Sequence, residues 1–245
     1  EWEREPFWWK EIKHDWPVPS PQTGRVERNF PLPYSDKPQY RNSSFMDNFE
    51  SEQLNLQWNF RRVPLEKTYS LNERPGYLRL FSSPNAIKER SRCSLMGIRQ
   101  TESDIEYVVK MEFAQNTKDV EAGISLFQKD DNYFTLTLED RSGSTSLTLK
   151  LAEPNKPVIT LKETSLANYA GTILFKTTAK GPKYHFAYSL DDGLTFTTIA
   201  EAPSHHILSK KYTGAYLGLY SSSNGKQTAG YADFDWINYR AFERP

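Results

Sequence analysis

The feature that most constrains the fold of this chain is a period-two alternation of apolar and polar residues, which recurs from residue 45 to the end. Successive side chains of a β-strand point to opposite faces, so each alternating segment predicts a strand with one buried face. Gly, Asn, Asp and Pro separate the segments, and no helical stripe of roughly 12 residues interrupts them. This pattern is typical of an all-β sandwich or barrel. The predicted strands cover 45–49, 54–58, 77–81, 106–113, 122–128, 133–139, 146–151, 158–161, 172–177, 184–189, 215–220 and 232–239.

Two turns are predicted between these strands. Residues 129–132 join the segments 122–128 and 133–139 into a hairpin. Asp191-Asp192-Gly193 forms a second hairpin turn, in which the glycine supplies the positive φ. A similar aspartate cluster can bind calcium, but the later glutamate of an EF-hand loop is absent here, so we interpret the triplet as a turn.

Residues 1–44 differ in composition from the rest of the chain. Frequent prolines prevent a long helix and keep such a segment extended. Tryptophans in an extended segment indicate that it lies against an apolar surface, since a free linker is polar. We therefore predict an extended docking segment over 1–44 and a β-sandwich domain over 45–245. The residues concerned are Pro6, Pro17, Pro19, Pro21, Pro31, Pro33 and Pro38, with Trp2, Trp8, Trp9 and Trp16.

Charge and cysteine content limit the partners. The 31 basic and 31 acidic side chains cancel, so no net field attracts nucleic acid or anionic lipid. No apolar run approaches the roughly 18 residues of a membrane span. The single cysteine, Cys93, excludes an internal disulfide and a thiolate zinc site. Residues 1–5 lack the features of a signal peptide, so the chain either has no export signal or starts partway through a longer protein. Periplasmic, secreted and cytoplasmic locations therefore all stay open.

No catalytic motif is evident in the sequence. A nucleophile elbow, a P-loop, a dinucleotide fingerprint and a His-Glu-x-x-His zinc motif are all absent. A glycosidase needs two carboxyl groups that face each other across a cleft, roughly 5 to 10 Å apart. The acids within apolar strands are candidates, although outward-facing strand positions explain them equally well, and we predict no catalytic residue. These acids are Glu112, Glu121, Glu139, Asp233 and Asp235.

A structural calcium site is one reading of the acids at the two ends of the domain. Asp47 and Glu50 begin the predicted sandwich, and Asp233 and Asp235 lie in its last strand. The first and last strands of a sandwich are often neighbours, so these oxygens could converge on Ca²⁺. Solvated or turn-capping carboxylates are the alternative. No other cofactor is expected.

An ordered series of motifs resembles a known module. Phe45–Glu50, Leu56–Arg61 and Glu73–Leu80 are similar to the opening of the C-terminal concanavalin A-like sandwich of glycoside hydrolase family 43, found in β-xylosidases and α-L-arabinofuranosidases. The resemblance spans residues 45–240 and implies a two-sheet antiparallel β-sandwich, a concanavalin A-like jelly roll. Later matches are Leu95–Gln100, Glu121–Phe127, Asn132–Phe134, Tyr188–Gly193, Leu208–Ser209, Tyr212–Tyr220 and Ala232–Trp236.

The first residues resemble the end of that family's catalytic domain. The matching pieces are Arg4–Phe7, Trp16–Val18 and Gly24–Val26, although Pro6 replaces a threonine and Asp15 a glycine. The resemblance implies a catalytic five-bladed propeller, in the same parent chain or as a separate chain, that carries the catalytic acids. This chain alone is therefore expected to be inactive.

The same resemblance implies one pocket residue. The family has a Phe-Thr-Gly motif whose phenylalanine lines the mouth of the substrate pocket. Tyr212-Thr213-Gly214 stands at that position, so Tyr212 is expected to form a pocket wall. An aromatic residue packed under an edge loop is the alternative interpretation of Tyr212.

Three functions follow as hypotheses. The first is an accessory module that stabilises the propeller and helps to close its substrate pocket, in an enzyme that degrades xylan or other xylose- and arabinose-containing polysaccharides. The second is an independent carbohydrate-binding module for xylo- or arabino-oligosaccharides; exposed rings would favour it, and rings buried in the core would count against it. The third is a free-standing glycosidase with two facing carboxylates on a concave sheet. Stacking residues for the second would be Trp58, Tyr133, Phe134, Tyr216 and Tyr220.

Overall fold

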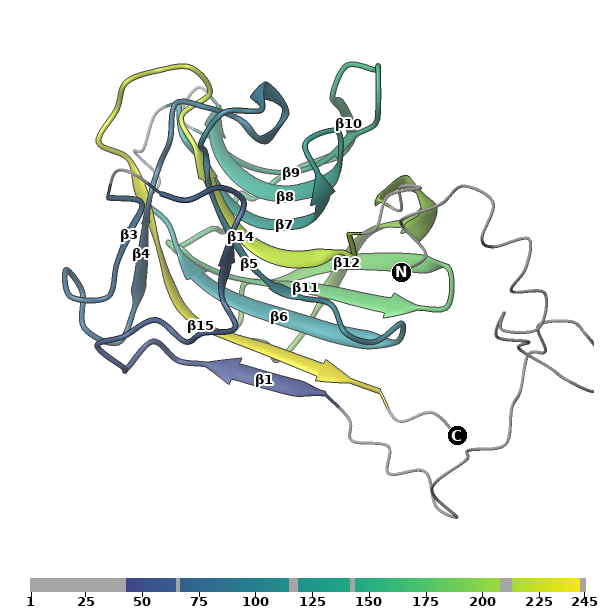
Figure 1. The fold of residues 1–245 in the computed structure, drawn as a ribbon, viewed down its shortest axis with the longest axis horizontal. Helices are drawn as coiled ribbons and strands as arrows, with labels where there is room; N and C mark the ends of the chain where they lie inside the picture. Colours follow the sequence, from purple (N-terminus) through teal and green to yellow (C-terminus); the bar gives the residue numbers. More distant parts are fainter. Residues whose placement is uncertain (1–42, 65–66, 115–118, 142–143, 208–212, 243–245) are drawn as a thin grey trace, which may run out of the picture. The chain divides into compact units, whose positions relative to one another are not determined.

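Two stacked antiparallel sheets make up the part of the chain that the structure describes (Figure 1). The structure is a computed structural model that describes residues 43–64, 67–114, 119–141, 144–207 and 213–242. These residues belong to one unit, Asn42–Pro245. Of the predicted docking segment 1–44, residues 1–42 lie outside the described residues.

The first sheet, sheet A, has eight strands, with β1 (Ser44–Asp47) paired to one of its central strands, β15. Its order is β13 (Thr197–Pro203), β12 (Lys183–Ser189), β11 (Thr172–Lys180), β6 (Ile105–Glu112), β15 (Tyr231–Ala241), β4 (Leu78–Phe81) and β3 (Tyr69–Ser70).

The second sheet, sheet B, has seven strands and is strongly curved, with its concave face turned away from sheet A (Figure 1). Its order is β10 (Ile159–Ser165), β9 (Ser144–Ala152), β8 (Asn132–Arg141), β7 (Glu121–Lys129), β14 (Tyr216–Ser222), β5 (Ser94–Arg99) and β2 (Asn59–Phe60). The predicted all-β class and the two-sheet antiparallel sandwich are confirmed.

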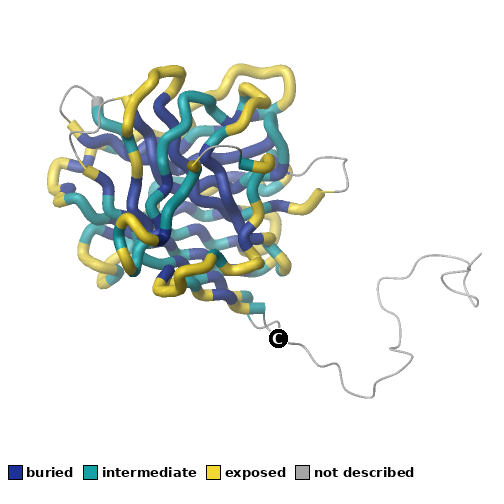
Figure 2. The backbone as a smooth tube through the Cα atoms, turned by 60° about the vertical axis from the view of Figure 1, so that its left-hand side comes forward, coloured by how far each residue is buried: buried dark blue, intermediate teal, exposed yellow. Residues whose placement is uncertain are grey.

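The main core lies between the two sheets. Strand β6 shows the origin of this core, because Ile105, Tyr107, Val109 and Met111 are fully buried while the residues between them are partly exposed. Phe134 of sheet B meets Phe186 of sheet A with ring centroids 5.4 Å apart. Figure 2 shows buried strands inside and exposed connections around them. Burying each such large apolar side chain contributes about 1.5–3 kcal/mol, which is why the alternation fixes the two inner faces.

Most predicted strands are present, and one is wrong. Residues 54–58 alternate but form a loop, and Leu56 is fully exposed. Trp58 is nevertheless buried, because its ring packs against Phe45 and Phe49 and its Nε1 donates to Asp47 Oδ2 at 2.8 Å. Strands β2, β3, β5 and β13 were not predicted. Strands β2 and β3 have only two residues each, β5 contains Gly97, and β13 is a polar edge strand of sheet A.

Both predicted turns are confirmed. Strands β7 and β8 form a hairpin around Asp130 and Asp131. Between β12 and β13, Asp192 and Gly193 have φ values of 55° and 87°. The Asp191 carboxylate accepts hydrogen bonds from the Thr195 amide and hydroxyl.

A segment between β4 and β5 covers part of the concave face of sheet B (Figure 1). It contains the 3-10 helix η2 (Ile87–Glu89). Ile87 is fully buried in a small second cluster with Leu95, Tyr133, Ala152 and Tyr220. The residues of sheet B are therefore buried on both faces where this segment lies. In the described part of the chain, no helix has the length and apolar character that crossing a bilayer requires.

Candidate functional site

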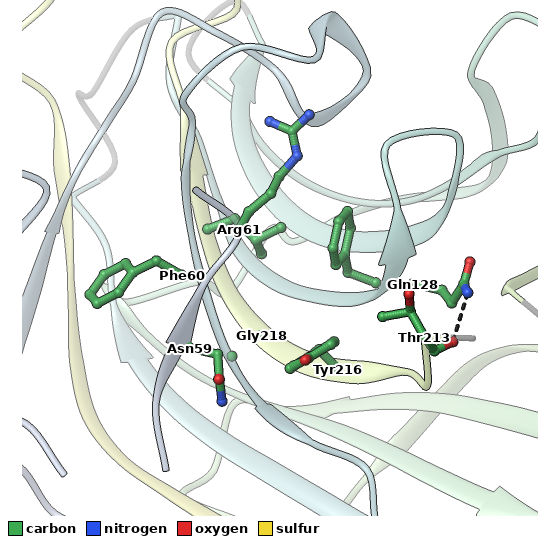
Figure 3. A pocket seen from close by; sticks show the side chains of 10 residues that line it. Asn59, Phe60, Arg61, Gln128, Thr213, Tyr216 and Gly218 are labelled. Atoms are coloured by element: carbon green, nitrogen blue, oxygen red, sulfur yellow. Dashed lines mark hydrogen bonds between the residues drawn. The ribbon is translucent and has the colours of Figure 1, made fainter. Parts of the chain in front are cut away.

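An open cavity of about 220 Å³ lies on the concave face of sheet B, beside the covered part (Figure 3). It is formed by β2, β5, β14 and the end of β7. In Figure 3, Asn59 and Phe60 lie on one side of it, Gln128 and Thr213 lie on the other, and Tyr216 and Gly218 lie between them.

Two glycines form the floor of this cavity. Gly97 of β5 and Gly218 of β14 are register partners. A Cβ atom on Gly97 would lie 2.9 Å from the Leu217 carbonyl oxygen, and one on Gly218 would lie 2.9 Å from Leu95 Cδ1. Both contacts are closer than real Cβ atoms reach, so the pair keeps the backbone of the sheet bare at this point.

Two aromatic rings stand next to the floor. Tyr216 and Phe127 are register partners on β14 and β7, and both are partly exposed. The Tyr216 hydroxyl accepts a hydrogen bond from Arg99 Nη2 at 2.8 Å. This bond holds the ring at the entrance of the cavity.

Two amide side chains of the β7–β8 hairpin bind the residues on either side of the segment 207–212. Gln128 Nε2 donates to the carbonyl oxygen of Thr213 at 2.7 Å. Asn132 Nδ2 donates to that of His206 at 2.9 Å. The amides therefore fix the chain on both sides of the segment that contains Tyr212, while Tyr212 itself lies outside the described residues.

Arg61 closes the cavity at the end near η2. Its side chain is 3% exposed, and its Nε donates to Asp130 Oδ1 at 2.6 Å. Its Nη1 donates to the Ser91 carbonyl oxygen and lies 3.6 Å from Cys93 Sγ. Burial raises the pKa of the Cys93 thiol despite this nearby guanidinium, so Cys93 does not have the lowered pKa of a reactive thiol.

The predicted row of stacking rings is wrong for four of its five members. Trp58 and Phe134 belong to the core between the sheets, at 6% and 0% exposure. Tyr133 and Tyr220 lie on the concave face, but the segment containing Ile87 covers them to 4% and 2% exposure. Only Tyr216 reaches the surface, because it lies beyond the edge of that segment.

Glu121 and Glu139 are register partners on the concave face, as a concanavalin-like glycosidase would require, but both are paired with the same lysine. Lys150 Nζ lies 2.6 Å from Glu121 Oε2 and 2.9 Å from Glu139 Oε1. Glu121 is 4% exposed and also accepts hydrogen bonds from Thr137 and Tyr220. Two acids joined by one lysine do not face each other across a cleft, so this arrangement does not support a free-standing glycosidase.

The other candidate acids lie on the outer face of sheet A. Asp233 binds Arg79 through two hydrogen bonds, of 2.7 Å and 2.8 Å. Glu112 accepts from Arg74 Nη1 at 2.7 Å and from the Tyr77 hydroxyl at 2.8 Å. Burial alone would raise the pKa of Glu112, but these hydrogen bonds outweigh it and hold the pKa below its ordinary value. Glu112 is therefore an anion and not a general acid.

The predicted calcium ligands do not come together. Strands β1 and β15 are neighbours, as expected. However, Asp47 Oδ1 accepts from the Phe49 amide and Oδ2 from Trp58 Nε1, while Asp235 pairs with Lys110 at 3.2 Å and Glu50 is exposed. Within the described ranges, no group of three or more His, Cys, Asp or Glu is placed to hold a metal ion. As these residues are placed, they do not fit a calcium site.

Comparison with known families identifies the sandwich. Residues 46–240 match the sequence model described as the β-xylosidase C-terminal concanavalin A-like domain. The chain is 26% identical over 222 residues to a non-reducing end α-L-arabinofuranosidase of Bacteroides ovatus, covering 90% of this chain and 41% of that protein. It is 29% identical over 245 residues to a xylosidase/arabinosidase of Butyrivibrio fibrisolvens, covering 96% of this chain and 46% of that protein. The chain thus spans less than half the length of these relatives.

Solved structures give the same result. The structure of Bacteroides ovatus Xyloglucan PUL GH43B superposes with a TM-score of 0.76 at 25% identity, over 87% of this chain and 42% of that one. The GH43 BlXynB protein from Bacillus licheniformis gives a TM-score of 0.72 at 25% identity, over 80% and 39%. The concanavalin A-like sandwich implied by the motifs is therefore confirmed.

Proposed function

The chain belongs to the family of β-xylosidase C-terminal concanavalin A-like domains of glycoside hydrolase family 43, and we propose that it serves as the accessory β-sandwich of such a hydrolase. Its partner is a catalytic five-bladed propeller, in the same parent chain or in a separate one. The substrates are glycans that contain xylose or arabinose. The observation that carries this proposal is that the chain matches a C-terminal domain and covers only 41% and 46% of two relatives that are named for these activities.

The mechanism is indirect. The sandwich stabilises the propeller by packing against it, and it supplies one wall of the substrate pocket through the segment that contains Tyr212. The bracket formed by Gln128 and Asn132 supports this role, because a pocket wall must hold its position when substrate binds. Tyrosine at position 212 keeps an aromatic ring for contact with the sugar and adds a hydroxyl group.

Two other functions receive less support. An independent carbohydrate-binding module with a row of stacking rings is disfavoured by the burial of Trp58, Tyr133, Phe134 and Tyr220. A free-standing glycosidase is disfavoured because Lys150 joins the two facing acids of the concave sheet.

An activity assay of the pure chain tests the proposal. With nitrophenyl β-xyloside and nitrophenyl α-L-arabinofuranoside we expect no turnover. A chimera in which this chain replaces the matched C-terminal region of the Bacteroides ovatus arabinofuranosidase should recover activity that the truncated enzyme lacks. Turnover by this chain alone, abolished by Glu121→Gln or Glu139→Gln, would overturn the proposal.

A further inference from the structure

We propose that the cavity above Gly97 and Gly218 is a binding subsite for a single neutral sugar residue, one that the sandwich binds by itself. This inference goes beyond the accessory role, because the residues that form the site all belong to the sandwich. Its walls are the rings of Tyr216 and Phe127, and its polar groups come from Asn59, Thr213 and Gln128.

The size of the cavity selects a small ligand. Its volume of about 220 Å³ is below the roughly 300–1,000 Å³ of pockets that bind drug-sized molecules. One sugar ring is of suitable size, whereas a long stretch of polysaccharide is not. The bare backbone at Gly97 and Gly218 provides the depth, because any side chain there would collide with a neighbouring strand.

The lining has the chemistry that recognises a sugar. The apolar C–H face of a pyranose or furanose packs on aromatic rings, which Tyr216 and Phe127 offer. The Asn59 amide and the Thr213 residue are exposed on opposite sides of the cavity (Figure 3). Asn59 Nδ2 donates to the Gln57 carbonyl oxygen at 2.7 Å, which sets the direction of its amide. Hydroxyl groups around a ring can thus be bound from two sides.

Gln128 gives an independent indication of a missing donor. Its side chain is 3% exposed, and in the described part of the chain its Oε1 has no hydrogen-bond partner. A buried acceptor without a donor costs about 1–3 kcal/mol. Less than 1 Å² of this oxygen is exposed, so a sugar hydroxyl supplies the donor only when the Gln128 side chain turns toward the cavity.

The charges around the cavity favour a neutral ligand. The Arg61 guanidinium is buried and engaged by Asp130, Ser91 and Cys93. Arg99 donates to the Tyr216 hydroxyl. Since Asp130 already balances the charge of Arg61, an anion gains little beside that residue, whereas a neutral sugar carries no charge that must be desolvated.

An NMR titration of the intact chain tests the site. The probes are xylose, arabinose, xylobiose and glucuronic acid, each raised to about 50 mM, since a single sugar contact gives millimolar affinity. We expect amide shifts at Gly97, Tyr216 and Gly218 with the neutral sugars. No shifts with any probe, or tighter binding of glucuronic acid than of xylose, would overturn the proposal.

Two matched tyrosine variants locate the binding. Tyr216→Ala should weaken binding at least about tenfold, equivalent to about 1.4 kcal/mol. Tyr231→Ala is the control, because Tyr231 lies on sheet A and also contacts an arginine. The Arg79 guanidinium carbon lies 3.8 Å from the centroid of the Tyr231 ring. Thermal melts verify that both variants fold, and Asn59→Ala, at an exposed position, gives a second probe of the site. Equal affinity of Tyr216→Ala and the unaltered chain would place the sugar elsewhere and refute the site. Because the titration contains no propeller, its failure would leave the accessory role intact.

Discussion

Gln128 and Asn132 lie on the two strands of one hairpin, on either side of its turn. The Gln128 amide donates to the carbonyl oxygen of Thr213, and the Asn132 amide donates to that of His206, so the two bonds lie on opposite sides of residues 207–212. The two bonds, of 2.7 Å and 2.9 Å, connect residues that are 85 and 74 positions apart in sequence. The β7–β8 hairpin therefore holds the two residues, His206 and Thr213, that flank the segment containing Tyr212.

Removing this bracket should loosen the segment without unfolding the sandwich. We expect the double variant Gln128→Leu/Asn132→Leu to speed amide hydrogen exchange at Gly214 and Ala215, while global stability falls by about 1 kcal/mol per lost bond. Hydrogen-exchange mass spectrometry measures the first effect and urea unfolding the second. Exchange as slow as in the unaltered chain would show that other contacts hold the segment.

Lys150 lies between the buried Glu121 and the partly buried Glu139 and offsets the repulsion between their charges, so its removal should be costly. Lys150→Met leaves Glu121 and Glu139 facing each other without a cation, and we expect a loss of about 3–5 kcal/mol at neutral pH. Lowering the pH should recover part of this loss as a carboxylate becomes protonated. The control is Lys183→Met, whose exposed pair with Glu201 should contribute little. Equal unfolding midpoints in urea for the two variants would contradict the role of Lys150.

The two glycines of the cavity floor should not tolerate a methyl group. Gly97→Ala and Gly218→Ala each place a Cβ 2.9 Å from a neighbouring atom, and we expect a loss of about 1–3 kcal/mol. Gly214→Ala is the matched control, because a Cβ at that position meets nothing within 4 Å. Thermal unfolding compares the three variants, and a control as unstable as the floor variants would refute the steric explanation.

The turn between β12 and β13 should contribute to acid sensitivity. Hydrogen bonds from Ser189 and Thr195 lower the pKa of Asp191 from 3.8 to about 2. A lowered pKa in the folded state means that this carboxylate stabilises the fold fully above pH 3.8, and that the contribution is lost as the pH falls toward 2. In the Asp191→Asn variant, the melting temperature should therefore fall less steeply as the pH is lowered through this range. Glu50→Gln, at an exposed position, serves as the control and should keep the slope of the unaltered chain.

Local sequence determined the fold class because the signals for it are local. Alternation over 106–113 and 133–139 identified the inner faces, since apolar burial dominates the choice of face on a strand. The turns at 129–132 and 191–193 followed from the backbone preferences of Asp, Asn and Gly. The same logic failed at 54–58, where alternating residues form a loop and Trp58 is buried through contacts with Phe45 and Phe49.

The tertiary structure alone decided which outward-facing residues are available. The alternation places Tyr133, Tyr216 and Tyr220 on one face of sheet B, but only the path of the segment around Ile87 determines that two of them are covered and Tyr216 is not. In the same way, Glu121 and Glu139 are paired with Lys150 from a third strand, and Gly97 meets Gly218 from a distant part of the chain. Period-two alternation predicts which face of the sheet a side chain lies on. What packs against that face depends on strand order and register, which are set by long-range pairing.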